Sequence, residues 1–571
     1  MSNINGKSKA ERTYDAIVVG SGISGGWAAK ELCEKGLKTI VLDRGRDVKH
    51  IEDYPTANKD PWEFKFGGKI SQKEIDEHYP KQNRTGYTVR AQHKHFFVKD
   101  SEHPYNEING KRFDWIRGYQ VGGRSLVWGR QCYRWSDYDF EANMKDGHGV
   151  DWPIRYKDIA SWYSYVEKFA GISGQSEGLP QLPDSEFLPP MDYNCIEKHV
   201  RSRVKEQFND RIVTIGRTAH LTVPHNGRGQ CQSRNRCMRG CPYGAYFSSQ
   251  SSTLPAAEKT GNLTIRPFSI ATEVMYDKET GKATGVRIID KETKEIIEYY
   301  AKVVFLCASA VASTSILMQS KPEGHENGLG NESGALGKYL MDHHFKAGAR
   351  AEFDGFEDQY FVGRRPNGTY VPRFRNLGGD TDRDYVRGFG YQGGGSRGGW
   401  HQVAEEKGFG ADLKKAVQMP GGWTMNFHGF GETLPYEDNF MQLNYDKLDS
   451  WGLPTVDFNT EIKENEMKMR EDMKASAKEM LEAAGGKNVQ TYDDKYGVGL
   501  GIHEMGTARM GRDRKTSVLN GHNQVWGAEN VFVTDGACMT SASCVNPSLT
   551  YMALTARAAD FAAKALKSGK L

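Results

Sequence analysis

Gly20-Ser-Gly-Ile-Ser-Gly25 follows an apolar run, Tyr14–Val19, and precedes a helical stretch, Trp27–Lys35. A second apolar run, Lys38–Leu42, then ends at Asp43. In such a turn the first glycine permits a tight bend, the second lets the backbone approach a pyrophosphate, and the third lets the helix pack on the strand. The positive end of the helix dipole faces the phosphates. The order of strand, turn, helix, strand and acid predicts a dinucleotide-binding βαβ unit.

An acidic residue in the place of Asp43 can accept hydrogen bonds from the ribose 2′-hydroxyl of a bound nucleotide. This argues against NADP but does not separate NAD from FAD. In this unit we expect cofactor contacts from Gly20, Gly22, Ile23, Ser24, Gly25, Asp43 and Arg44.

The bulk properties of the chain bound its class. With 571 residues it is too long for one core, so two or more cooperating domains are expected. The net charge of +3 is spread along the chain, which gives no case for nucleic-acid binding. No apolar run reaches the ~18 residues of a transmembrane helix. Residues 1–11 are polar, so we expect no Sec-type signal in the chain itself.

Three cysteines lie in one short polar stretch, with Cys231, Cys237 and Cys241 in the spacing C-x5-C-x3-C-P. Thiolates gathered this tightly are typical of metal or cluster ligands, or of a redox device. Zinc takes four ligands, and His225 could complete such a set. The C-x3-C-P ending is typical of ferredoxin runs, and three cysteines with no obvious fourth fit a three-iron cluster. The plain alternative is three unconnected thiols. The other six cysteines are expected to be buried thiols rather than disulfides.

Four further segments resemble the glucose–methanol–choline (GMC) oxidoreductase family. They are a glycine loop at 118–129, a strand-to-helix turn at 307–317, a histidine segment at 501–511, and C-terminal elements at 533–536 and 546–550. The matches run in family order from about Tyr14 to Phe561, whereas residues 49–117 and 345–497 match only loosely. The resemblance implies FAD as the cofactor. It also implies an α/β, Rossmann-like FAD-binding domain built from separated segments, and a substrate domain with an antiparallel sheet and helices.

The resemblance divides the chain as follows. Residues 1–13 form a polar tail. The FAD-binding domain takes residues 14–48, 112–150, 216–344 and 498–571, and includes the cysteine loop at 226–245. The substrate-binding domain and insertions take residues 49–111, 151–215 and 345–497.

The family segments add further expected FAD contacts. These are Gly122, Gly123, Ser125, Trp128, Gly129, Val274, Ala308, Asp535, Gly536, Asn546, Pro547 and Thr550. Some family members bond FAD covalently through a histidine just before the tryptophan of the first glycine loop. Here that position is Val127, so non-covalent FAD is expected.

The chain's own patterns agree with this organisation. Runs at 263–267, 273–276 and 283–289, separated by turn residues, predict a β-meander. Residues 461–484 predict a charged amphipathic helix, with an apolar stripe that favours packing over cofactor binding. The stretch 378–410, rich in glycine, arginine and aromatic residues, predicts long loops over the substrate entrance.

Two residues of the family segments are expected to carry the chemistry. Oxidation of an alcohol by a flavin moves a hydride to the flavin and a proton to a base, and neutral histidine is suited to take the proton near neutral pH. By resemblance His503 is the base, and Asn546 holds the same hydroxyl. His343 and His344 are predicted to be structural histidines near the cofactor. His428 and Glu432 are candidates for contacts to substrate hydroxyls.

The cysteine loop resembles that of a subgroup of the family, which includes FAD-dependent glucose dehydrogenases and glucoside 3-dehydrogenases. These enzymes carry a [3Fe-4S] cluster and work with a small partner subunit. The resemblance implies that Cys231, Cys237 and Cys241 hold such a cluster, which passes electrons from reduced FAD to an external acceptor such as a c-type cytochrome. A cluster is needed only when the acceptor is another protein, so a dehydrogenase is favoured over an oxygen-using oxidase.

The leading hypothesis is therefore a sugar dehydrogenase acting at C3 of glucosides or disaccharides. The alternatives are oxidation of glucose at C1, or of another polyol or sugar acid, by the same machinery. A different class is a non-catalytic electron carrier or a zinc-stabilised module. Clusters are assembled in the cytoplasm, so a small partner with a twin-arginine signal would export the folded chain to the periplasm. The alternative location is the cytoplasm.

Overall fold

β1 (Thr13–Val19) lies inside a parallel sheet and is buried on both of its faces. It pairs in parallel with β2 (Thr39–Leu42) and β8 (Ile296–Leu306). β5 (Leu263–Arg266) extends the sheet beyond β2, and β17 (Ala528–Val533) extends it beyond β8. This computed structural model describes residues 8–360, 366–399, 409–494 and 496–571.

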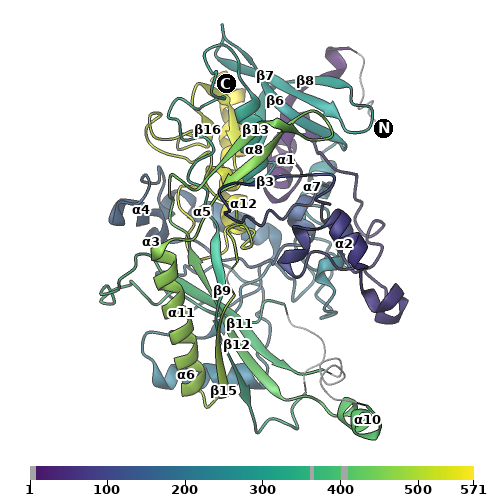
Figure 1. The fold of residues 1–571 in the computed structure, drawn as a ribbon. Coiled ribbons are helices and arrows are strands. Elements are labelled where there is room, and N and C mark those ends of the chain that lie inside the picture. Colours follow the sequence, from purple (N-terminus) through teal and green to yellow (C-terminus); the bar gives the residue numbers. More distant parts are fainter. Residues whose placement is uncertain (1–7, 361–365, 400–408, 495) are drawn as a thin grey trace.

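α1 (Ile23–Glu34) follows the glycine turn and begins four residues before the predicted start at Trp27. Its buried residues include Ala28, Ala29, Leu32 and Cys33, which pack in one hydrophobic cluster with residues of β1, β2 and β8. α12 (Ser548–Lys567) lies against α1 and α5 (Tyr156–Ala170), as Figure 1 shows for the upper part of the molecule. The first and last helices of the chain thus cover the same sheet.

The predicted meander is correct in part. β6 (Ser269–Asp277), β7 (Lys282–Asp290) and β8 form antiparallel pairs, so three strands do fold back on one another. β5 was predicted to be the first strand of this meander, and that prediction was wrong, because β5 pairs in parallel with β2. The chain turns away between β5 and β6 at Phe268, whose φ is +54°. The eighth strand of this sheet is β16 (Gln524–Val525).

A second, six-stranded sheet occupies the lower half of Figure 1. Its strands, in spatial order, are β15 (Lys487–Asp493), β9 (His343–Phe353), β12 (Trp423–Glu432), β11 (Phe389–Arg397), β10 (Thr369–Val371) and β4 (Thr214–Ile215). All of its pairings are antiparallel. α11 (Glu464–Ala483) packs along β9, β12 and β15, close to the range predicted from the sequence.

The prediction of continuous loops over residues 378–410 was wrong for β11. Two of its glycines, Gly390 and Gly393, sit where a neighbouring strand comes close: a Cβ on Gly393 would lie 2.1 Å from the backbone oxygen of Asn426. Glycine here is a packing requirement of a strand and not the mark of a loop. Residues 400–408 of the predicted loop lie outside the described part of the chain.

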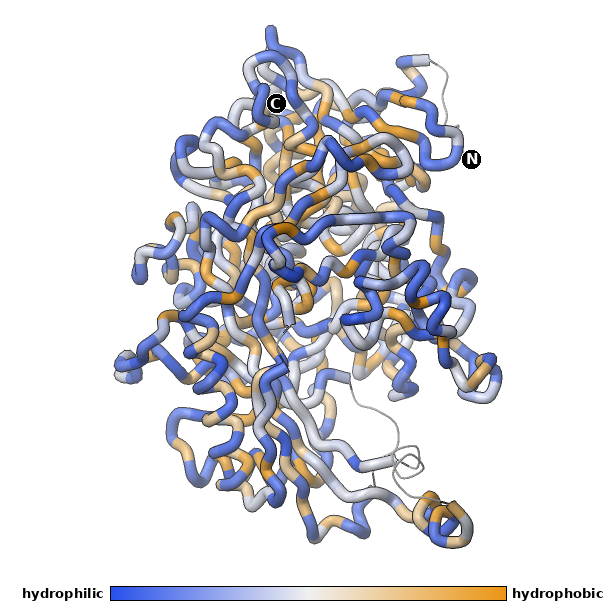
Figure 2. Tube along the Cα trace, in the orientation of Figure 1, coloured by the Kyte–Doolittle hydropathy of each residue, from blue (hydrophilic) through white to orange (hydrophobic). Residues whose placement is uncertain are grey.

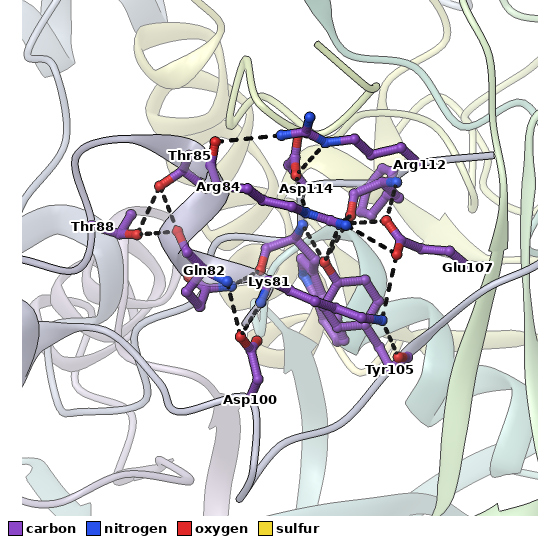
Figure 3. A network of polar contacts seen from close by, with 12 residues as sticks. Lys81, Gln82, Arg84, Thr85, Thr88, Asp100, Tyr105, Glu107, Arg112 and Asp114 are labelled. Carbon is purple, nitrogen blue, oxygen red and sulfur yellow. Dashed lines mark hydrogen bonds and ion pairs between the residues drawn. The ribbon is translucent and has the colours of Figure 1, made fainter. Parts of the chain in front are cut away.

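A third sheet and a polar network hold the segment that leads into the first glycine loop. β3 (Asn106–Glu107) pairs with β14 (Pro454–Asn459), which pairs with β13 (Phe440–Leu448). Figure 3 shows Arg84 between Glu107 and Asp114, with its Nε 3.0 Å from an Asp114 oxygen. The backbone N–H of Asp114 donates to the carbonyl of Val498, 2.9 Å away. The network therefore ties this segment to the chain just before His503.

Hydrophobic residues gather in the interior of both halves, and hydrophilic ones follow the outer loops (Figure 2). Within the described residues, no helix has the length and apolar character needed to cross a bilayer. The remaining α-helices are α2 (Gln72–His78), α3 (Asp137–Phe140), α4 (Ala142–Asp146), α6 (Cys195–Gln207), α7 (Thr253–Glu258), α8 (Ala310–Gln319) and α10 (Ala411–Gln418).

Candidate active site

A cavity of about 1210 Å³ runs from the carboxyl end of β1 to the face of β11 and β12. One end is lined by the glycine turn after β1 and by the first glycine loop. The other end is lined by strands of the second sheet, among them Gln392, Asn426 and His428. Residues from both halves of the molecule therefore line one cavity. Its position at the carboxyl ends of parallel strands is where α/β sheets bind ligands.

The glycines of the first turn make a cradle at the β1 end of the cavity. Gly20 has a φ of +90°, and a Cβ there would lie 2.6 Å from the carbonyl oxygen of Cys307. A Cβ on Gly25 would lie 1.9 Å from the carbonyl oxygen of Gly20, so this glycine allows α1 to pack on the turn. A Cβ on Gly22 would meet no atom within 4 Å and would enter the cavity. The residues present therefore fit a pyrophosphate held against bare backbone.

Asp43 is buried beside this cradle. Its carboxylate accepts hydrogen bonds from the backbone N–H groups of Ser21, at 3.1 Å, and Gly45, at 2.9 Å. Burial raises the pKa of Asp43, while these hydrogen bonds lower it. Arg44, the next residue, pairs with Asp449 at 3.0 Å and also lines the cavity.

Most of the predicted cofactor contacts line the cavity. They are Gly20, Gly22, Ile23, Ser24, Asp43, Arg44, Gly123, Ser125, Trp128, Gly129, Ala308, Asp535, Gly536 and Asn546. Five others lie behind its wall: Gly25, Gly122, Val274, Pro547 and Thr550. Val274, for example, is buried in β6, and its backbone N–H donates to Ser320 Oγ at 2.8 Å. Val127 lines the cavity.

A buried carboxylate shapes the histidine segment. Asp342 accepts hydrogen bonds from four backbone N–H groups, those of His343, Gly499, Gly501 and His503, at 2.8 to 3.0 Å. Two chain segments that are far apart in sequence are thereby held around one side chain. This arrangement places His503 on the cavity wall and His343 directly behind it.

The contacts of His343 fix the tautomer of His503. His343 Nε2 lies 2.8 Å from the carbonyl oxygen of Ser543, which can only accept, so Nε2 carries the hydrogen. Burial lowers the pKa of His343 to about 4, so its ring is neutral and Nδ1 holds a lone pair. The Nδ1 atoms of His343 and His503 are 2.7 Å apart, so His503 donates from Nδ1. His503 Nε2 is then left with its lone pair, on the side of Asn546.

His503 is held in the neutral form. Burial lowers its pKa well below 6.5, and the neighbouring His343 and the Arg124 guanidinium lower it further. Arg124 itself is paired with Glu504 through two hydrogen bonds of 3.0 and 2.8 Å. A neutral imidazole with a free Nε2 lone pair is ready to accept a proton.

Asn546 lies beside the free nitrogen of His503. Its Nδ2 is 3.4 Å from His503 Nε2, and both residues line the cavity. Its Oδ1 accepts a hydrogen bond of 2.7 Å from Gln392 Nε2 of β11. One hydroxyl placed between Asn546 and His503 could donate to the histidine and accept from the asparagine.

The two predicted substrate residues lie in different surroundings. His428 lines the cavity, and its Nε2 is 2.9 Å from Asn426 Nδ2. Burial and the charge of Lys346 lower the pKa of His428 to about 4. Glu432 is buried away from the cavity lining, where it accepts from the backbone N–H of Ala542 and pairs with Arg387 at 3.3 Å.

The three cysteines of the polar loop lie near one another but not as a set of ligands. Burial raises the pKa of Cys231, and the neighbouring Cys237 and Cys241 raise it further. Cys237 Sγ is 3.7 Å from His220 Nε2, whereas His225 bonds to the carbonyl of Lys168. Among the described residues, no three His, Cys, Asp or Glu side chains are arranged to hold a metal ion. The thiols as placed do not fit a cluster.

All nine cysteines lie in the described part of the chain and are free thiols. Of the six outside the polar loop, only Cys195 is partly exposed. The prediction of buried thiols therefore holds for Cys33, Cys132, Cys307, Cys538 and Cys544 but not for Cys195.

Comparison with known families covers most of the chain. The two profiles of the GMC oxidoreductases match residues 14–345 and 435–555. The chain belongs to the GMC oxidoreductase family. It is therefore an enzyme, an FAD-binding oxidoreductase that acts on alcohols or sugars, as the glycine cradle and the His503–Asn546 pair indicate.

Several characterised proteins are similar over nearly their whole length. A 2-methyl-1,2-propanediol dehydrogenase of Mycolicibacterium austroafricanum is 28% identical, covering 97% of this chain and 96% of the relative. The fructose dehydrogenase large subunit of Gluconobacter japonicus is 25% identical, covering 97% and 98%. The gluconate 2-dehydrogenase flavoprotein of Pantoea cypripedii is 23% identical, covering 95% and 92%.

A crystal structure supports the fold. The pyridoxine 4-oxidase from Mesorbium loti superposes with a TM-score of 0.57 at 13% identity, covering 96% of this chain and 98% of that one. At this identity the likeness concerns the fold alone. It agrees with the predicted α/β FAD-binding domain and separate sheet-rich domain.

The residues that surround His503 and Asn546 were not predicted from the sequence. His343 was predicted to be structural, yet it contacts His503 directly. Gln392 and Gln131 were not singled out, and both line the cavity. The one available signal was the position of His343 after a family-like segment. Nothing in the local sequence distinguishes either glutamine from a surface residue.

Proposed function

We propose that this enzyme is an FAD-dependent sugar dehydrogenase that oxidises a secondary alcohol, the C3 hydroxyl of a glucoside or disaccharide. The observation that carries the proposal is the pair formed by His503 Nε2 and Asn546 Nδ2, 3.4 Å apart on the wall of the cavity. A base and a hydrogen-bond donor at this spacing match the two needs of one reacting hydroxyl.

The chain's own groups have separate tasks in this reaction. His503 accepts the hydroxyl proton at Nε2, and Asn546 donates to the same oxygen and so orients the carbon–hydrogen bond. Bound FAD supplies the hydride acceptor, held by the glycine cradle and the first glycine loop. Val127 and Trp128 also line the cavity and add apolar surface to its wall.

Several polar side chains support a sugar as the substrate. Beyond the catalytic pair the cavity is lined by the amides of Gln131, Asn367, Gln392 and Asn426, together with His428. Amides both donate and accept, which suits a ring with several hydroxyl groups. The names of the relatives also support a sugar, a sugar acid or a small diol. Oxidation at C3 rests on the resemblance noted in the sequence. Glucose at C1, or another polyol or sugar acid, is the competing substrate.

One anaerobic experiment tests this proposal. Purified holoenzyme is mixed with glucose, methyl glucosides, disaccharides, gluconate and simple diols, and bleaching of the oxidised flavin is followed. We expect bleaching by glucosides and a 3-keto sugar as the product. A lactone formed from glucose would show that oxidation takes place at C1 and not at C3. If no sugar bleaches the flavin, the proposal of a sugar dehydrogenase is wrong.

We also propose that the FAD is non-covalent, because Val127 offers no nucleophile at the position of the family's covalent histidine. Acid precipitation should leave the flavin in the supernatant. Flavin that stays on the pellet would contradict this. We further propose that residues 14–48, 112–150, 216–344 and 498–571 form the FAD-binding domain. Residues 49–111, 151–215 and 345–497 would form the substrate-binding domain and its insertions.

A [3Fe-4S] cluster on Cys231, Cys237 and Cys241 is proposed from the sequence resemblance alone. The loop would have to rearrange to bind it, since the thiols as placed do not form a ligand set. Anaerobically prepared protein should contain about three irons and matching sulfide per chain. Cys237→Ser should remove iron and block electron delivery to a cytochrome while sparing flavin reduction by sugar. Zinc in place of iron would reject the cluster.

Export from the cytoplasm and a partner subunit are also proposed from the sequence resemblance. The relatives include one named as a large subunit, which supports a multi-subunit enzyme. We propose a small partner with a twin-arginine signal, a c-type cytochrome as acceptor, and a periplasmic location. Cells expressing the chain with and without its partner should differ, with periplasmic enzyme only in the pair. Fully active enzyme that stays in the cytoplasm in both cases would reject this.

A further inference from the structure

Asn546 is the end of a row of side-chain amides. Its Oδ1 accepts from Gln392 Nε2 at 2.7 Å, and Gln392 Oε1 accepts from Gln131 Nε2 at 3.1 Å. Gln131 Oε1 in turn accepts from the hydroxyl of Tyr133 at 2.6 Å. Tyr133 and Gln131 are buried, with 0% and 7% of their surface exposed. The row crosses between the two halves of the molecule, because Gln392 belongs to β11 of the second sheet.

Taken alone, such a row could run in either direction. If every amide were flipped, Asn546 would donate to Gln392, Gln392 to Gln131, and Gln131 to Tyr133, with the same distances. Asn546 would then present its oxygen to His503. The hydrogen-bond distances within the row do not choose between these two states.

The contacts of the two histidines decide between these two directions of the row. The Ser543 carbonyl fixes the hydrogen of His343 on Nε2, and His343 fixes the hydrogen of His503 on Nδ1. His503 Nε2 is therefore an acceptor, so the atom of Asn546 that faces it must be the donor Nδ2. Asn546 Oδ1 must then accept from Gln392, which makes Gln392 Oε1 accept from Gln131. One carbonyl thus sets the direction of every hydrogen bond as far as Tyr133.

We propose that Gln392 and Gln131 are positioning residues that hold Asn546 with its N–H toward the reacting oxygen. They do so by continuing, in one direction, the hydrogen-bond chain that fixes the base. This inference rests on the proposed function, since it assigns how the donor of the same catalytic pair is oriented. It explains why two uncharged glutamines, one of them on β11, form a hydrogen-bonded row that ends at Asn546.

The variant Gln392→Glu provides the test, because it keeps the shape of the side chain and changes the direction of the row. The introduced carboxyl group, when ionised, could only accept, so Asn546 would turn its N–H toward it and its oxygen toward His503. When protonated, the same carboxyl group could donate and would restore the original direction. Flavin reduction by Gln392→Glu should therefore fall as the pH rises through the pKa of the introduced carboxyl, toward a ~10²-fold loss, the usual effect of losing one such donor.

In the wild-type enzyme, the rate of flavin reduction should stay constant or increase as the pH rises through the same range. Protonation of His503 slows the reaction only at low pH, because its pKa lies well below 6.5. The other titratable or charged groups that bear on the pair are His343, the Arg124–Glu504 ion pair, and Lys346 beside His428. All of these groups remain in every variant. A loss of activity toward high pH that the wild type lacks would therefore come from the side chain introduced at position 392.

Two further variants separate direction from shape. Gln392→Leu removes the hydrogen bond without imposing a reversal, so it should lose only about 3- to 10-fold. At high pH the isosteric Gln392→Glu should be worse than Gln392→Leu, which no purely structural role predicts. Gln131→Glu should repeat the loss with rising pH, because the reversal passes through Gln392. Gln490→Glu on β15, whose Oε1 accepts from Arg350 outside the cavity, is the matched control and should keep the wild-type profile.

A measurement without substrate keeps this inference separate from the identity of the sugar. Asn546 Oδ1 turned toward His503 Nε2 would stabilise the protonated imidazole, so the pKa of His503 should rise in Gln392→Glu. A pH titration of the oxidised flavin spectrum of the holoenzyme reads this shift even if no sugar is ever oxidised. An unchanged titration, or a Gln392→Glu profile parallel to that of the wild type, would overturn the proposal.

Discussion

Asp342 is the residue that holds the backbone of His503 in place. Its carboxylate satisfies four buried backbone N–H groups, including that of His503. Asp342→Asn would turn an amide N–H toward some of these donors and leave them without an acceptor. Each buried donor left unpaired costs about 1–3 kcal/mol. We expect a clearly lower thermal midpoint together with slower flavin reduction. Unchanged stability would show that the four contacts are not formed.

His503 should carry the proton transfer and nothing else. His503→Ala is expected to lower the rate of flavin reduction by ~10²–10⁴-fold, the usual value of a positioned base. FAD content should be unchanged, which separates chemistry from folding. Asn546→Ala should be milder. Losses confined to substrate affinity, with full reduction rates in both variants, would contradict the assignment.

The buried histidines make the fold sensitive to acid. Burial lowers the pKa of His343, His344 and His503 below 6.5, so the unfolded chain binds protons that the native chain resists. The free energy of unfolding therefore keeps its full value above about pH 6.5, the pKa of histidine in the unfolded chain. It decreases as the pH falls below that value. Chemical unfolding at a series of pH values should show this fall. His344→Gln should make it shallower, because one of the three groups is removed.

Residue roles could be predicted only where a local motif carried them. The glycine turn predicted its own conformation, and the histidine segment placed His503 by resemblance. The contacts His343–His503 and Gln392–Asn546 join residues 160 and 154 positions apart, and in each a strand of the six-stranded sheet meets a distant loop. No short-range spacing encodes such a meeting. Val274 and Glu432 illustrate the same limit, since only the folded strands decide which side faces the cavity.

At the scale of elements, two glycines of one turn should behave differently. Gly22→Ala adds a methyl group that meets no protein atom within 4 Å, so the fold should form but the pyrophosphate should be displaced. Gly25→Ala places a methyl group 1.9 Å from the Gly20 carbonyl, so α1 should lose its packing on the turn. We expect weaker FAD binding with normal apoprotein stability for Gly22→Ala. Gly25→Ala should lose both. Equal effects would reject this division of roles.

Strands and helices could be predicted where their buried residues repeat in a regular pattern along the sequence. The stripe of α11 and the apolar runs of β1 and β2 were recognised because each side chain pattern repeats within one element. β11 was missed because its glycines carry no pattern. At Gly393 the small size is required by β12 across the pair, where the Asn426 carbonyl comes close. β5 was recognised as a strand, but its partner β2 lies more than two hundred residues earlier in the chain.

For the whole molecule, the order of strands in the parallel sheet sets a sequence of events during synthesis. The sheet draws on β1 near the start of the chain and on β17, which ends at Val533. α12, which covers α1, is made later still. A ribosome that has released the glycine turn has therefore not yet released the strand, the asparagine or the helix that complete the flavin site. The nascent chain must therefore keep β1 and β8 available until β17 and α12 have been made, and the flavin site cannot be complete before then.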